Sequence, residues 1–183
     1  AFGRSALVAN TTGSQNTASG YYALKSNTTG TLNTAVGSNS LQSTTTGSYN
    51  AGFGYQALYC NTTGTQNTAI GYNILNKNTT GQHSTALGSQ ALYYSTTGAK
   101  NTATGFEVLC KNTTGTQNTA SGMRALVTNT TGSLNTASGN YALFANTTGA
   151  SNTGVGYQAL YTQTTGSCNT GIGACALALN TTG

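Results

Sequence analysis

The string Thr-Thr-Gly recurs along the whole chain at a constant interval of 17 residues, without an insertion or a deletion. If the residue before this string is repeat position 1, the consensus reads N-T-T-G-x-x-N-T-A-x-G-x-x-A-L-x-x. The chain is then one repeat array over 1–183, with ten full copies over 10–179 and partial copies over 1–9 and 180–183. Because both ends fall within a repeat, we expect a fragment of a longer protein.

A repeat of this length predicts an all-β fold. Helix–turn–helix repeats need about 34 residues, and two glycines per copy destabilise helices. Threonine, in contrast, favours extended backbone. The sequence therefore predicts a parallel β-solenoid (a β-roll) of 17-residue coils. Within each coil we expect one extended segment at repeat positions 6–10 and a second at positions 13–17 that continues to position 3.

Besides the two threonines of Thr-Thr-Gly, three repeat positions never change, and each of the three predicts a structural role. Glycine at positions 4 and 11 indicates turns that need a positive φ or a close backbone approach. Leucine at position 15 is the expected core residue. Representative residues of this structural repeat are Gly13, Gly20, Leu24, Gly64, Gly71, Leu75, Gly149, Gly156 and Leu160.

Stacked coils place like residues above like residues, about 4.8 Å apart. Asparagine and threonine side chains can then form hydrogen bonds along each rank, which accounts for asparagine at positions 1 and 7. The whole array would form a rod about 50 Å long.

We also expect a homo-oligomer. Ordering a coil costs about 25 kcal/mol of conformational entropy, whereas burying one leucine returns only about 1.5–3 kcal/mol. Small residues at position 9 and mostly apolar or hydroxylated residues at position 10 suit a tight symmetric interface. The expected partner is therefore the chain itself, as a trimer or an end-to-end fibre.

Two groups of known proteins carry similar repeats. The segments 67–71 (NTAIG), 33–37 (NTAVG) and 152–156 (NTGVG) resemble the head repeats of trimeric autotransporter adhesins. The segment 156–161 (GYQALY), followed by Thr-Thr-Gly at Thr164, is similar to repeats of phage tail-fibre proteins. Both resemblances imply a trimeric, left-handed β-roll that projects from a cell or a virion and attaches to a surface.

The charged residues exclude several function classes. They make up 4% of the chain, against about 25% in typical soluble domains. The basic residues look scattered along the sequence, so we expect no nucleic-acid partner, and no apolar run is long enough for membrane insertion. The basic residues are Arg4, Lys25, Lys77, Lys100, Lys111 and Arg124.

The chain also lacks the residues for common catalytic sites. Glu107 is its only carboxylate side chain and His83 its only histidine, so neither paired carboxylates nor a Ser-His-Asp triad is available. His83 occupies a variable position and is expected on the surface. Calcium-binding β-rolls need an aspartate in each repeat. We therefore predict no enzymatic activity, no metal and no cofactor.

The four cysteines occupy four different repeat positions and form no regular pattern. We interpret them as free thiols, with a contact across one coil between Cys168 and Cys175 as the alternative. The other two are Cys60 and Cys110.

Asn-Thr-Thr is also an N-glycosylation signal. Thr44, Ser95 and Gln163 replace the asparagine in three copies while Thr-Thr-Gly persists. This favours a structural role, although glycosylation stays open. The candidate acceptors are Asn10, Asn27, Asn61, Asn78, Asn112, Asn129, Asn146 and Asn180.

Two kinds of surface row suggest binding. Tyrosine rows can contact sugars or become buried between packed chains. Threonine rows suggest ice binding, but adjacent residues such as Thr11 and Thr12 should point to opposite faces of a strand. The tyrosines are Tyr21, Tyr55, Tyr72 and Tyr157 at position 12, and Tyr59, Tyr93 and Tyr161 at position 16.

These observations favour a structural or adhesive shaft of an extracellular fibre, at a cell surface or on a virion. The alternatives are a phage tail-fibre shaft and a surface-binding module that uses its tyrosine or threonine rows on glycans or ice. Host-surface glycans are then the expected external partner.

Overall fold

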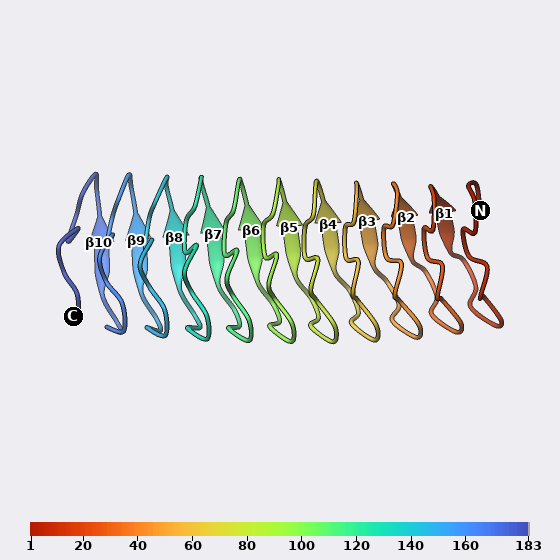
Figure 1. The fold of residues 1–183 in the computed structure, drawn as a ribbon. Coiled ribbons are helices and arrows are strands. Elements are labelled where there is room, and N and C mark those ends of the chain that lie inside the picture. Colours follow the sequence, from red (N-terminus) through yellow and green to blue (C-terminus); the bar gives the residue numbers. More distant parts are fainter. Residues whose placement is uncertain (183) are drawn as a thin grey trace.

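The computed structural model describes residues 1–182 and consists of stacked coils that form one straight rod (Figure 1). Ten strands form a single parallel sheet in chain order, which confirms the predicted parallel β-solenoid. The strands are β1 (Thr17–Ser19), β2 (Thr34–Val36), β3 (Ala51–Phe53), β4 (Thr68–Ile70), β5 (Thr85–Leu87), β6 (Thr102–Thr104), β7 (Thr119–Ser121), β8 (Thr136–Ser138), β9 (Thr153–Val155) and β10 (Thr170–Ile172).

Every strand pairs with its copy in the next coil. Thr17 lies beside Thr34, and Ala18 lies beside Ala35. The same offset continues through all the strand pairs to β9 and β10. The constant interval in the sequence therefore becomes a constant register, so equivalent side chains form straight ranks along the rod.

The strands turn their central residue inward, and this corrects the expectation for repeat position 9. The small residues there, such as Ala35 and Ala69, are completely buried inside the coil and are not available to a partner chain. Side chains alternate along a strand, so positions 8 and 10 face outward instead. Position 9 is small because it packs against the leucine core, where a larger side chain would not fit.

The second predicted extended segment is wrong, because positions 12–17 form consecutive turns. The backbone has positive φ at position 13 and again at position 15, as in Tyr22 (58°) and Leu24 (49°). The Asn27 N–H donates to the carbonyl oxygen of Leu24 at 3.2 Å, a local turn bond that a strand lacks. The Leu24 N–H still donates to Ser40 in the next coil, so turns as well as strands join the coils.

The invariant leucines adopt a backbone conformation that usually favours glycine. A left-handed conformation costs a non-glycine residue roughly 1–3 kcal/mol. Complete burial of a leucine side chain returns a comparable or larger free energy, about 1.5–3 kcal/mol. The nine completely buried ones are Leu24, Leu41, Leu58, Leu75, Leu92, Leu109, Leu126, Leu143 and Leu160.

Buried asparagines form two hydrogen-bonded ladders that meet at one backbone oxygen in each coil. At position 1, Asn129 Nδ2 donates to Asn112 Oδ1 in the previous coil (2.8 Å) and to the Gly132 carbonyl (2.9 Å). At position 7, Asn118 Nδ2 donates to the same Gly132 carbonyl at 2.9 Å. Asn118 Oδ1 accepts the backbone N–H of the next position-7 residue, Asn135, at 3.0 Å. Each regular position-4 carbonyl thus accepts two amide donors.

As the sequence predicts, the backbone requires glycine at positions 4 and 11, but the physical reason differs between the two positions. Position 11 has φ between 116° and 142°, and a Cβ there would collide with the backbone of the next coil in nearly every copy. Position 4 has no positive φ, yet a Cβ on Gly64 would overlap Asn61 Oδ1 and the Gly81 carbonyl. Position 4 therefore requires glycine only because two coils and an asparagine approach it closely.

In the part of the chain that the structure describes, no helix has the length and hydrophobicity needed to span a bilayer.

Glycine at position 11 is required both by its positive φ and by the close approach of the next coil. Gly88→Ala disturbs both, and Gly173→Ala is the matched control that disturbs only the first. Both glycines have similar φ, 127° and 121°, but only Gly88 has the next backbone in the way. Because this collision cannot relax without separating coils, we expect Gly88→Ala to lower the free energy of unfolding by more than about 3 kcal/mol. Gly173→Ala should cost only the backbone strain, about 1–3 kcal/mol. Equal losses in chemical denaturation would contradict the close-approach explanation.

Candidate binding surface

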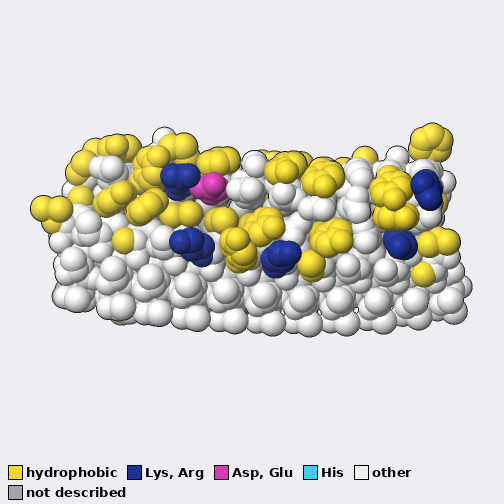
Figure 2. All heavy atoms as spheres, viewed as in Figure 1, with side chains coloured by type: hydrophobic (Ala, Val, Ile, Leu, Met, Phe, Trp, Pro, Cys, Tyr) yellow, Lys and Arg dark blue, Asp and Glu magenta, His cyan; other side chains and the backbone are white. Residues whose placement is uncertain are grey.

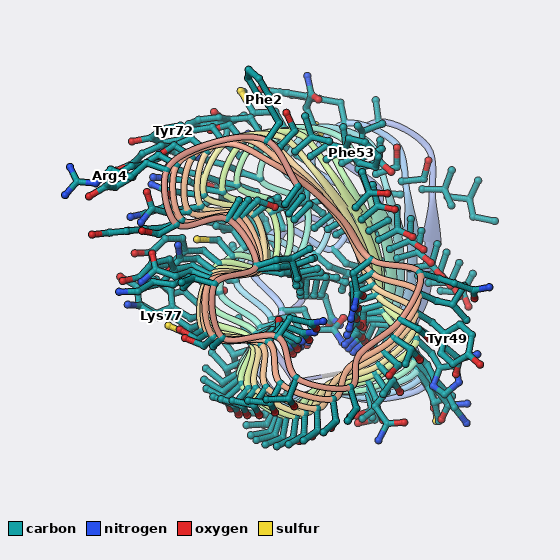
Figure 3. The ribbon with its side chains drawn as sticks, turned by 90° about the vertical axis from the view of Figure 1, so that its right-hand side faces the viewer. Phe2, Arg4, Tyr49, Phe53, Tyr72 and Lys77 are labelled. Atoms are coloured by element: carbon teal, nitrogen blue, oxygen red, sulfur yellow. The ribbon has the colours of Figure 1, made fainter. Side chains whose placement is uncertain are left out.

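One side of the rod collects most of the aromatic and basic side chains. We call it the variable face, and it consists of repeat positions 12, 13, 16 and 17. Arg4, Tyr72 and Lys77 project from this side, whereas Tyr49 at position 6 projects from the opposite side (Figure 3). Ten of the eleven tyrosines and five of the six basic residues occupy the variable face, because only Tyr49 and Lys100 are at position 6.

The basic residues are therefore not scattered in space, which corrects the sequence interpretation. Figure 2 shows Lys and Arg side chains gathered along the face turned to the viewer, with an acidic side chain among them. That acid is Glu107, whose carboxylate oxygen lies 2.7 Å from Nε of Arg124. Four positive charges on this face remain without a carboxylate partner, since Glu107 is the only acidic side chain of the chain. The variable face has a net positive charge and many exposed aromatic rings.

Several cations lie against aromatic rings at the surface. Lys25 Nζ is 4.3 Å from the ring centre of Tyr22. Arg4 lies 5.9 Å from the ring centre of Tyr21, and Lys77 Nζ lies 5.9 Å from that of Tyr93. The phenol groups of Tyr21 and Tyr22 form a hydrogen bond, which raises the pKa of Tyr21 and lowers the pKa of Tyr22. These cation–π contacts hold flexible side chains close to rigid rings.

The two predicted tyrosine rows differ in exposure. The position-12 row, Tyr21, Tyr55, Tyr72 and Tyr157, is exposed, and the stacked rings of Tyr55 and Tyr72 are 5.5 Å apart. The position-16 tyrosines, Tyr59, Tyr93 and Tyr161, are half-buried. The position-12 row is therefore the better candidate for contact with a ligand.

Sequence reasoning missed an aromatic cluster near the C-terminal end of the face. The ring centres of Phe144 and Tyr161 are 4.9 Å apart, and Tyr141 lies within 5.7 Å of Phe144. The pattern within any single repeat position does not reveal this cluster, because its members occupy positions 13 and 16 in two coils. Phe144 also lines an open hollow beside the Glu107–Arg124 ion pair, together with Lys111, Val127 and Thr128.

Cys110 is half-buried next to this ion pair. Burial of the thiol, and secondly the negative charge of Glu107, raise the pKa of Cys110 to about 11. Cys168 and Cys175 are exposed, and all four cysteines are free thiols. The alternative contact between Cys168 and Cys175 forms no disulfide.

The residues considered for catalysis do not come together. His83 is exposed at position 6, the repeat position of Tyr49, which projects from the side opposite the variable face (Figure 3), whereas Glu107 is at position 13 of the variable face. Among residues 1–182, no three histidine, cysteine, aspartate or glutamate side chains are grouped as a metal-ligand set.

The candidate glycosylation sites lie mostly inside the coil. Asn27, Asn61, Asn78, Asn112, Asn129 and Asn146 are completely or almost completely buried. Their Nδ2 atoms, which would carry a glycan, donate hydrogen bonds to the position-4 carbonyls. This geometry favours the structural role. Asn10 and Asn180, in the end coils, are half-buried.

The adjacent threonines at positions 2 and 3 lie in a bend and not in a strand, so the alternation of side chains expected along a strand does not apply to them. At position 2, Thr28 is half-buried and its Oγ1 donates to the Thr45 carbonyl at 3.1 Å. At position 3, Thr29 is exposed. The bends that precede the strands form a band without charged or hydrophobic side chains along the lower edge of the rod (Figure 2).

A third surface is the outward row at position 10. Val36, Phe53, Ile70 and Leu87 are exposed in four successive coils, with 37–46% of each residue accessible. The row then becomes polar at Thr104 and remains so at the next two coils. An exposed apolar row of this kind is typical of a protein contact.

Comparison with models of protein families, with curated proteins and with solved structures gives no match to this chain. The repeat geometry is therefore described from the residues of this chain alone, and the β-solenoid fold is compatible with a structural repeat protein.

Labelling of the cysteines checks the environment of Cys110. At pH 8 a thiol whose pKa is about 11 is ionised to roughly one part in a thousand, and only the thiolate reacts. We expect iodoacetamide to modify the exposed Cys168 and Cys175 first and Cys110 at least tenfold more slowly. Peptide mass spectrometry of the folded chain measures each rate. Equal rates in the folded chain would contradict the burial of Cys110, and the denatured chain provides the control.

Proposed function

We propose that this chain is the shaft of an extracellular fibre, displayed at a cell surface or on a virion. The observation that supports this proposal most is the unbroken register from β1 to β10, in which every coil adds the same rise to a straight rod. Coils stacked in this way can extend without changing their contacts, as in other solenoid repeats. The two sequence resemblances favour the same role.

A shaft also needs contacts that hold neighbouring rods together, and the position-10 row is the candidate for them. It places Val36, Phe53, Ile70 and Leu87 along a flat sheet face. Apolar surface of this kind gains about 25 cal/mol for each Å² that is removed from water. As part of the proposal, copies of the chain associate through this row, in a trimer or a higher fibre.

The double variant Ile70→Lys/Leu87→Lys tests this association. Lysines in adjacent coils would place like charges on every copy of the contact, where they would repel each other and remain without partners. We expect the unaltered chain to form oligomeric rods at micromolar concentration and the variant to be monomeric. Multi-angle light scattering gives the mass, and negative-stain electron microscopy gives the shape.

Thr63→Lys/Thr80→Lys is the matched control, since both residues are exposed at position 3 on another surface. This control should remain oligomeric. A monomeric unaltered chain, or association that survives the Ile70 and Leu87 substitutions, would reject the position-10 contact.

The variable face favours a second function, attachment to glycans. Its exposed tyrosine row provides flat rings for sugar faces, and its unpaired cations provide partners for carboxylates or sulfates. These groups lie side by side, as in the contact of Lys25 with Tyr22. We infer that a fibre of this kind attaches through its variable face to acidic polysaccharides.

Binding of polygalacturonate, with neutral dextran as the comparison, tests this second function. Tyr55→Ser/Tyr72→Ser removes the stacked pair, and we expect at least a tenfold loss of affinity for the acidic polymer, measured by biolayer interferometry. Salt should weaken binding because exposed charges are screened. His83→Ser/Tyr49→Ser, on the opposite side, should bind normally. Preference for single-stranded DNA or for dextran would contradict an acidic glycan.

A further inference from the structure

Both asparagine ladders are interrupted at the same carbonyl oxygen, that of Gly98. In a regular coil this position-4 oxygen accepts Nδ2–H donors from position 1 of its own coil and position 7 of the previous coil. For Gly98 these positions are Ser95 and Ser84, whose side chains carry no amide. No hydrogen bond from any described residue reaches the Gly98 oxygen, although Gly98 is buried.

The neighbouring groups of the position-1 ladder have also lost partners. Asn78 Oδ1 is buried and accepts no hydrogen bond, because Ser95 cannot extend to it. Ser95 Oγ is buried and makes no hydrogen bond either. Asn112 Nδ2 donates one proton to the Gly115 carbonyl at 3.0 Å, but its second proton lacks the ladder acceptor that Asn129 Nδ2 finds in Asn112 Oδ1.

These unpaired atoms surround one small region of the interior. A Cβ on Gly81 would meet both Asn78 Oδ1 and the Gly98 oxygen, so these two acceptors are close neighbours. A Cβ on Gly98 would lie 2.9 Å from Asn112 Nδ2 and 3.1 Å from Ser95 Oγ. The part of an asparagine that Ser95 lacks is roughly the size of a water molecule, which occupies about 30 Å³ in the liquid.

We propose that this region is a binding site for one internal water molecule. The water donates its two protons to Asn78 Oδ1 and the Gly98 oxygen, and it accepts protons from Ser95 Oγ and Asn112 Nδ2. It thereby replaces the carboxamide of the missing asparagine and reconnects the ladder. Buried waters in proteins typically make about three hydrogen bonds to groups that are otherwise unsatisfied.

The mixture of donors and acceptors selects water over a cation. A sodium or calcium ion needs oxygen ligands on all sides, whereas the second Nδ2–H of Asn112 is a donor with a partial positive charge. The hydroxyl of Ser95 can serve either role. The site is also uncharged, because Glu107 is the only acid of the chain and is paired with Arg124.

The other interruptions of the position-1 ladder do not form such a site. Thr44 accepts the Asn61 Nδ2–H at 3.5 Å, and the Gly47 oxygen keeps its donor from Asn33 at 2.8 Å. Gln163 is long enough to donate to the Gly166 oxygen at 2.7 Å. Asn27 Oδ1 and Asn146 Oδ1 are also unpaired at these two levels, but among residues 1–182 only the level of Ser95 combines an unpaired position-4 carbonyl with an unpaired amide oxygen and a smaller side chain at position 1.

Crystal structures of the full chain and of Ser95→Asn, at about 1.5 Å resolution or better, test the proposal. We expect a single water peak within hydrogen-bond distance of Asn78 Oδ1, Ser95 Oγ and the Gly98 oxygen. In Ser95→Asn the new carboxamide should occupy this place and expel the water. The midpoint of thermal unfolding should rise by about 2–4 °C, because direct hydrogen bonds replace an immobilised solvent molecule.

Two further variants, Ser95→Ala and Thr44→Asn, serve as comparisons. Ser95→Ala keeps the space but removes one partner of the water, so its unfolding midpoint should fall. Thr44→Asn repairs a level without the proposed site, and no internal water should disappear there. An empty region in the unaltered chain, or a cation with only oxygen ligands, would overturn the proposal. A Ser95→Asn variant that keeps the water would overturn it as well.

Discussion

Each side chain of this rod lies next to the equivalent side chains of the coils above and below it. Among the buried polar residues, asparagine suits this arrangement best. An asparagine side chain donates in one direction along the rank and accepts in the other, so identical residues satisfy each other, as Asn112, Asn129 and Asn146 do. A buried charge in the same rank would meet like charges about 4.8 Å away and would lack solvation. The near absence of charge in the interior follows from the stacking itself.

The close approach of coils explains why glycine and leucine are invariant although their roles differ. At position 11 the carbonyl of the next coil occupies the space of a Cβ, so no larger residue fits between coils. At position 15 the backbone has a conformation that suits glycine, yet glycine would leave the core empty. Leucine remains because the free energy gained by burial is comparable to or exceeds the strain. Where there is room for a side chain, as at position 15, packing in the core determines the residue. Where there is no room, as at position 11, the backbone of the next coil allows only glycine.

The period, the parallel stacking, the glycine roles and the asparagine ladders could be predicted because they depend on contacts between equivalent positions. The turns and side-chain directions within one coil could not be predicted in this way. Thr-Thr and positions 12–17 have residues that suit strands, but a closed coil of 17 residues needs turns there, as the positive φ of Leu24 shows. The inward direction of Ala35 and the gathering of basic side chains on one face depend on where those turns lie. Linear spacing along the sequence does not reveal this.

The fold separates the residues that build the rod from those that meet a partner. Positions 4, 9, 11 and 15 are confined by neighbouring coils, whereas positions 12, 13, 16 and 17 vary widely between copies without any change in register. Tyr72, Phe106 and Asn140 share position 12, so that position imposes little on the coil. Substitution there changes the surface at little cost to stability, since exposed sites usually contribute within about 0.5 kcal/mol. Exchange of asparagine for serine inside the ladder, as at Ser84 and Ser95, removes two amide donors from one carbonyl. Such an exchange leaves buried polar groups without a protein partner, so variation inside the coil costs more stability than variation at the surface.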